Sequence, residues 1–297
     1  MTKSMTRFSI VHETRYSYER AVTFGPQRLM LRPRDSHASR LVDASLSLSP
    51  PGATRWTYDA FGNCVCWFTP QGPAQRLIIT SHLTIARFPA PLSEPEADDP
   101  QSAMPLIYGG EDRVALAPYM SPATDDEQPQ FLHWLRGQTG RSEEPALDFL
   151  LRLNNAIHAG FDYKSRAAEG VQSPHETLAT GSGTCRDFAW LMVEGLRRLG
   201  FAARFVSGYL YSPKLEGGLR GAGATHAWCE VFLPDLGWTE FDPTNGLAES
   251  PDLIPVAVAR TPTQAAPVSG VITGDPGHID LHVDVKVSHE TPLPEAA

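Results

Sequence analysis

The chain has 297 residues, a hydrophobic fraction of 41% and a formal net charge of −9 at pH 7. This length and apolar content are enough for two modest hydrophobic cores. The acidic balance, without a basic run, argues against a nucleic-acid partner. No stretch approaches the roughly 18 apolar residues of a membrane span, and the short polar segment Met1 to Arg7 does not resemble a signal peptide. With four cysteines and no CxxC pattern, these features predict a cytoplasmic protein without a membrane partner.

Three regions follow one another along the chain. Residues 7–88 consist of short alternating runs with turn residues between them, which predicts an N-terminal antiparallel β sandwich. Residues 89–130 are rich in Pro, Asp and Glu and predict a surface linker. Residues 131–289 predict an α+β core, in which residues 252–289 add edge strands. The helices of this core are expected near residues 130–138, 145–159 and 185–199.

The helix expected at 185–199 has a well-marked start. Thr184 and Asp187 have the spacing of a capping box, which predicts Thr184 as the N-cap and Cys185 as the first helical residue. Gly200 is expected just beyond its end. One apolar stripe runs along the helix, and Glu194, Arg197 and Arg198 fall outside it. A thiol at a helix N-terminus meets the positive end of the helix dipole, which favours the reactive thiolate. The sequence therefore indicates Cys185 as a nucleophile.

A predicted hairpin carries His226 and Asp242. Residues 227–233 and 238–241 are strand-like, and residues 234–237 predict the turn. Cys, His and Asp are the side chains of an activated thiol nucleophile, with Asp orienting the imidazole. If the turn centres between Asp235 and Leu236, Asp242 faces Cys229, on the opposite face from His226. A triad therefore requires a three-residue loop centred near Pro234, or a bulge.

Several motifs together resemble those of the bacterial transglutaminase-like proteins. They are Cys185–Ala189, Ala203–Tyr209, His226–Trp228 and Asp242–Asn245 in the core, with Tyr16–Tyr18, Leu31–Arg34 and Asp59–Asn63 in the N-terminal part. The resemblance implies a papain-like core in which Cys185 is the nucleophile, His226 the base and Asp242 the orienting acid. Two departures are visible. Arg186 and Trp190 stand where many members carry Gln and His, and Ala259-Arg260 stands where Gly-Arg is common.

These residues predict a cysteine enzyme that cleaves peptide or isopeptide amide bonds of a peptide or protein substrate through a Cys185 thioester. We favour hydrolysis, since water needs no acceptor site, with protein-glutamine transamidation and a non-catalytic scaffold as alternatives. No cofactor is expected and no metal, because no calcium-ligand loop is present. Trp228 and Tyr209 are candidate substrate-binding residues, although Trp228 also fits a core aromatic. The glycine-rich segment from Pro213 to Ala224 is interpreted as a lid or as an irregular loop without a role.

The other three cysteines have simpler interpretations. Cys64 and Cys66 alternate along a predicted strand, so their thiols share one face. A metal or disulfide role is the alternative, but two such cysteines without further ligand spacing favour a core position. Cys229 is likewise expected to be structural.

Overall fold

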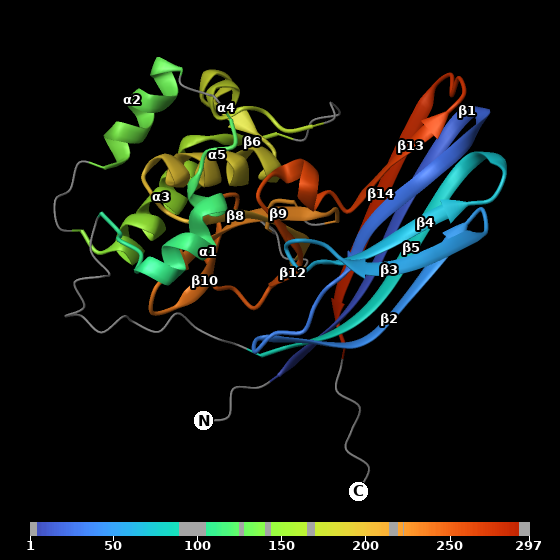
Figure 1. Ribbon diagram of the computed structural model, residues 1–297, viewed down its shortest axis with the longest axis horizontal. Helices are drawn as coiled ribbons and strands as arrows, with labels where there is room; N and C mark the ends of the chain where they lie inside the picture. The colour runs from blue at the N-terminus through green and yellow to red at the C-terminus, as the bar shows by residue number, and fades with distance from the viewer. Residues whose placement is uncertain are drawn as a thin grey trace, which may run out of the picture.

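The computed structural model describes residues 5–88, 105–124, 128–139, 144–164, 170–213, 219–221 and 223–290. Long antiparallel strands form one side of the molecule, and helices packed against a second sheet form the other (Figure 1). The predicted α+β class is confirmed. No helix in these ranges is long and apolar enough to cross a membrane.

Seven antiparallel strands form the N-terminal sheet, organised around one long strand, β1. They are β1 (Thr6–Arg32), β2 (Ser39–Ser49), β3 (Gly52–Tyr58), β4 (Cys64–Pro70), β5 (Pro73–Arg87), β13 (Val268–Thr273) and β14 (Ile279–His289). The first part of β1 pairs with β5 and β14, and its second part pairs with β4 and β13. Because β1 changes partners along its length, all these strands belong to one hydrogen-bonded network.

The C-terminal strands differ from expectation. We expected residues 252–289 to add edge strands to the core. Only β12 (Leu253–Ala259) does so, by pairing with β8. The later strands β13 and β14 pair with β1 and lie alongside it in Figure 1. Their alternating pattern specifies half-buried strands, but it carries no information about which sheet supplies the partner.

The core has a five-stranded sheet covered by helices. Its order is β11-β10-β9-β8-β12, formed by β8 (Ala203–Leu210), β9 (His226–Leu233), β10 (Gly237–Asp242), β11 (Leu247–Ala248) and β12. The helices are α1 (Gly110–Met120), α2 (Pro129–Gln138), α3 (Ala146–Gly160), α4 (Pro174–Thr180) and α5 (Cys185–Arg198). A short parallel pair joins β6 (Asp162–Tyr163) to β7 (Ser182–Gly183), and a 3₁₀ turn covers Pro262–Ala265. Helices α2, α3 and α5 match the predicted positions.

Part of the expected linker belongs to the core. Residues 89–104 and 125–127 lie outside the described residues, but 105–124 include α1. Leu106, Tyr108 and Leu116 are buried in the main core cluster. The Tyr108 hydroxyl donates to the carbonyl of Phe232 (2.9 Å) and accepts from the amide of Ala202 (2.8 Å). The polar composition of this stretch predicts a surface linker, although these few apolar residues pack in the core.

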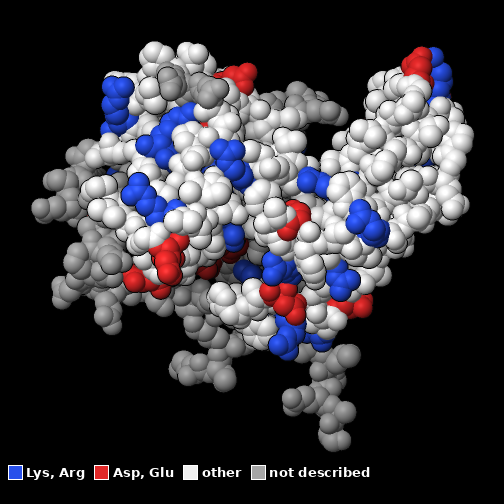
Figure 2. All heavy atoms as spheres, viewed as in Figure 1, with Lys and Arg blue, Asp and Glu red and all other residues white. Residues whose placement is uncertain are grey.

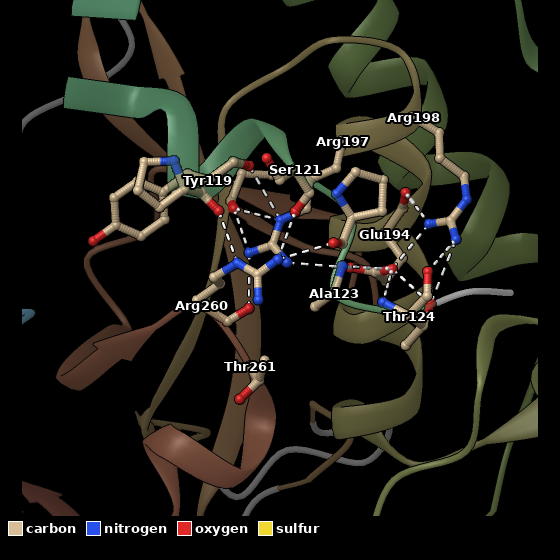
Figure 3. Close-up of polar contacts among 12 residues, drawn as sticks. Tyr119, Ser121, Ala123, Thr124, Glu194, Arg197, Arg198, Arg260 and Thr261 are labelled. Atoms are coloured by element: carbon tan, nitrogen blue, oxygen red, sulfur yellow. Dashed lines mark hydrogen bonds and ion pairs between the residues drawn. The ribbon is translucent and has the colours of Figure 1, made fainter. Parts of the chain in front are cut away.

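Helix α5 is buried on nearly all sides, and this includes two charged residues outside its apolar stripe. Glu194 is 0% exposed and Arg197 is 2% exposed. The Glu194 carboxylate pairs with Arg197 (3.1 Å) and Arg198 (2.9 Å), and it accepts hydrogen bonds from Ala123 and Thr124 (Figure 3). Buried charges are tolerated when they are paired and hydrogen-bonded. The network ties the segment after α1 to α5 and holds the helix in place.

Candidate active site

The N-terminus of α5 positions Cys185 as the sequence predicts. The Thr184 amide and hydroxyl both donate to Asp187 Oδ2, at 2.8 and 2.9 Å. Asp187 Oδ1 in turn accepts from the Gln172 amide (2.7 Å). A Cβ on Gly183 would lie 2.9 Å from that of Asp187, so only glycine fits this close approach. The first turn is rigid, and the Cys185 residue retains 5% exposure at its start.

The hairpin of β9 and β10 brings His226 and Asp242 together. Leu233 pairs with Gly237, which leaves a three-residue loop centred on Asp235. In this register Phe241 opposes Cys229, so Asp242 lies on the same face as His226, diagonally across the two strands. The two side chains meet, with His226 Nε2 at 2.8 Å from Asp242 Oδ2. The three-residue loop required by the sequence argument is confirmed, although its centre lies one residue beyond Pro234.

The electrostatics of this buried pair favour a charged imidazole. Burial by itself disfavours the charged ring of His226, but the charge and hydrogen bond of Asp242, with further contributions from the Cys185 thiol, raise its pKa to about 10. Burial would raise the pKa of Asp242, yet His226, Asn245 and the Thr244 amide leave it below its usual value. Because Nε2 is taken by Asp242, Nδ1 remains for the thiol; it is buried and makes no other hydrogen bond among the described residues.

Asn245 connects Asp242 to the glycine-rich segment. Its Nδ2 donates to Asp242 Oδ2 (2.8 Å) and to the Arg220 carbonyl (3.2 Å), and its Oδ1 accepts from the Arg220 amide (2.8 Å). Gly221 follows with φ of 88°, and a Cβ there would lie 2.8 Å from His226 Nδ1. Residues 214–218 and 222 of the predicted lid lie outside the described residues. Arg220 and Gly221 are therefore held beside the imidazole.

Tyr163 is a candidate that the sequence argument missed. It lies on β6, paired with Gly183 just before Cys185. Its hydroxyl lies 3.7 Å from the Cβ position of Gly221, which itself adjoins the His226 ring. Burial, then the charge of the Cys185 thiolate, raises the pKa of Tyr163 to about 12, so the hydroxyl keeps its proton. Its place in the short parallel pair with β7 depends on tertiary structure and had no local signal.

The two candidate substrate-binding residues have other surroundings. Trp228 is 0% exposed; its ring packs 5.9 Å from that of His226, and its Nε1 donates to Glu240 Oε1 (3.2 Å). Tyr209 is also buried, and its hydroxyl is 2.9 Å from His12 Nδ1 at the contact with the N-terminal sheet. Neither ring is open to a substrate, which corrects the expectation. Trp228 packs against the His226 ring, and Tyr209 connects the two sheets.

The remaining cysteines are free and largely buried. Cys66 packs in the core of the N-terminal sheet, and burial raises the pKa of its thiol to about 11. Burial likewise raises the pKa of Cys64 and of Cys229, which lies in the main core. Within the described ranges no three His, Cys, Asp or Glu side chains form a group suited to a metal ion. The core interpretation is confirmed for Cys66 and Cys229.

Comparison with known proteins places both regions in one family. Residues 8–86 match the bacterial transglutaminase-like N-terminal region, and residues 133–243 match the transglutaminase-like superfamily. A crystal structure from Cytophaga hutchinsonii, described as a candidate cysteine protease, has the same fold. It covers 98% of this chain and 93% of its own, with a TM-score of 0.71 and 19% identity.

Relatives in mycobacteria extend over nearly the whole chain. An uncharacterized protein of Mycobacterium bovis is 30% identical over 295 residues, which are 94% of this chain and 92% of that protein. An uncharacterized protein of Mycobacterium leprae is 27% identical, covering 96% and 99% respectively. The chain belongs to the bacterial transglutaminase-like family.

Proposed function

We propose that the protein is a cysteine hydrolase that cleaves peptide or isopeptide amide bonds through a thioester on Cys185. One observation carries this proposal: a thiol at the capped start of α5 shares a buried site with the hydrogen-bonded pair of His226 and Asp242. Three such groups on separate elements are the parts of an activated nucleophile. The description of the Cytophaga structure as a candidate cysteine protease agrees with it.

The geometry suggests the order of steps. The Cys185 thiolate attacks the amide carbonyl, forming a carbon–sulfur bond while the carbonyl electron pair moves to oxygen. Protonated His226 gives its proton to the leaving amine as the carbon–nitrogen bond breaks, which leaves a thioester. Water then attacks the thioester while His226 takes a proton from it, and the thiolate leaves. Asp242 holds the imidazole in the orientation that serves both halves.

Two donors are candidates for stabilising the oxyanion. The backbone N–H of Cys185 is at the helix start, where amides have no partner within the helix. The hydroxyl of Tyr163 lies 3.7 Å from the Cβ position of Gly221, which adjoins the imidazole, and it carries its proton at neutral pH. We expect Tyr163→Phe to lower kcat by about 100-fold with KM unchanged, in the range for loss of one oxyanion donor. Tyr58→Phe, at an exposed tyrosine of β3, is the matched control and keeps full activity.

Hydrolysis and transamidation share the thioester and differ in what accepts the acyl group. We favour hydrolysis because water needs no dedicated site. Four free thiols support the cytoplasm as the place where the enzyme acts.

The test is activity profiling of wild type and Cys185→Ala against a library of peptides, with and without primary amines. Cleavage that depends on Cys185 and is unchanged by added amine supports the proposal. Amine incorporation in place of cleavage establishes the transamidase instead. Cleavage at the same rate by Cys185→Ala rejects a cysteine mechanism.

A further inference from the structure

A cavity lies between the N-terminal sheet and the core. Its volume is about 640 Å³, and its walls come from residues 34–39 and the end of β5 on one side and from β8, β9, β10 and β12 on the other. Neither Cys185, His226 nor Asp242 lines it. Figure 2 shows a hollow on this face where basic and acidic side chains meet.

One wall of the cavity holds an arginine with incomplete hydrogen bonding. The Arg87 side chain is 7% exposed. Its Nη2 lies 3.4 Å from the Ser250 carbonyl and 3.7 Å from Glu240 Oε2, and its Nε is buried without a hydrogen-bond partner among the described residues. A buried guanidinium whose donors are unsatisfied costs free energy until an acceptor reaches it. Arg204, the neighbouring cation, is already paired with Glu230 (2.5 Å) and stacked on Trp238.

The same cavity is lined by five carboxyl side chains, two of which are Asp35 and Asp235. Glu230, Glu240 and Glu249 all line it, and Glu249 Oε1 accepts from the Glu240 amide (2.6 Å). Glu249 holds the left-handed conformation that non-glycine residues rarely adopt, with φ of 46°. Burial and the neighbouring carboxylates raise the pKa of Glu240 well above its usual range. A cation brought beside these carboxyls would favour their charged forms.

The cavity therefore contains a guanidinium that can bind an anionic group and carboxylates that can bind a cationic group. We infer that it binds a small zwitterion, a free amino acid or short peptide, whose carboxylate pairs with Arg87 and whose ammonium pairs with Glu240 and Glu249. The carboxylate adds an acceptor for the Arg87 guanidinium, whose contacts with Ser250 and Glu240 are long. The volume accommodates such a ligand, and among the described residues the acidic side chains do not form a group suited to a metal. The Cys185 thiol is not part of this site.

The experiment is isothermal titration calorimetry on Cys185→Ala protein, which removes turnover, with glycylglycine as the probe. N-acetylglycylglycine and glycylglycinamide each lack one of the two charges. We expect glycylglycine to bind at least tenfold more tightly than either. Binding should also release a proton, because the ammonium favours ionised Glu240; titrations in buffers of different ionisation enthalpy measure it.

Variants separate the two contacts. Arg87→Gln should abolish the preference over the C-terminal amide, and Glu240→Gln should abolish the proton release. Arg40→Gln, at an exposed arginine of β2 outside the cavity, is the control and should bind as the parent protein does. The ligand series on the parent protein needs no variant, so a variant that fails to fold does not weaken the test. The inference is overturned if glycylglycine does not bind at millimolar concentration, or if the capped peptides bind equally well. Binding to wild type that is lost when Cys185 is alkylated would place the ligand at the active site and would also overturn it.

Discussion

Replacement of Asp242 by Asn is the sharpest test of the proposed triad. Asp242 Oδ2 accepts from His226 and Asn245, while Oδ1 accepts from the Thr244 amide. An asparagine carbonyl can take the Oδ2 position and keep the imidazole in place. Its amide group then faces the Thr244 N–H, donor to donor. The change therefore removes the charge beside His226 while preserving most of the geometry.

The expected loss follows from these contacts. A hydrogen bond to a charged acceptor contributes about 1 kcal/mol more than one to a neutral acceptor. The Coulomb attraction of two charges about 4 Å apart adds up to about 4 kcal/mol at an effective dielectric of 20. Since each 1.36 kcal/mol is a factor of ten in rate, we expect kcat to fall by between about fivefold and a few thousandfold. The donor-to-donor contact costs a further 1–3 kcal/mol or so in stability.

The assay is steady-state cleavage of the best peptide found in the library, with wild type, Asp242→Asn and Asp284→Asn. Asp284 lies on β14, paired with Lys286 near the surface, so its replacement controls for the same chemical change at a distant site. Alkylation of Cys185 by iodoacetamide, followed by mass spectrometry, checks the thiol directly and should slow in parallel. An unchanged rate in Asp242→Asn would refute the role assigned to this carboxylate, provided that the variant is folded.

Three further outcomes are expected. Cys185→Ala should abolish cleavage, whereas Cys229→Ala should keep activity and lose about 1–2 kcal/mol of stability through a core cavity; cleavage assays with urea titration measure both effects, and loss of activity in Cys229→Ala alone would exchange their roles. The kcat should fall as pH rises through about 10, because His226 must be protonated to donate to the leaving amine. Asp242→Asn should shift this alkaline fall in kcat to lower pH, and an unshifted profile contradicts the effect of Asp242 on the pKa of His226. Glu194→Gln should lower the free energy of unfolding by about 3–5 kcal/mol, as for a broken buried ion pair; Glu13→Gln, in an exposed pair, should cost less than about 1 kcal/mol, and equal losses would refute the buried network.

The site could be anticipated where the signal is local. The cap of α5 depends on residues three positions apart, so Thr184 and Asp187 were enough to place Cys185 at the helix start. The pairing of His226 with Asp242 needed one further fact, the loop length. The sequence left two possibilities for this hairpin, a three-residue loop or a bulge. The observed register shows the three-residue loop, centred on Asp235.

Features that depend on distant segments could not be anticipated. Tyr163 reaches the site through a short parallel pair with β7 that has no periodic signature. An aromatic residue such as Trp228 suits both a cleft and a core, and only burial distinguishes the two. Arg87 and Glu240 meet across the contact between the two regions. No local pattern encodes such a meeting.

The pairing of β14 with β1 also constrains how the protein folds during synthesis. Residues 8–18 of β1 hydrogen-bond to residues 279–289, which leave the ribosome long after β1. Until then, this part of β1 presents an unpaired edge to other chains. The core sheet, from β8 to β12, is complete earlier and can fold first. We therefore expect the slowest step of folding to be the closure of the N-terminal sheet by β14, because contacts so distant in sequence form late. During that interval, the nascent chain is most exposed to aggregation.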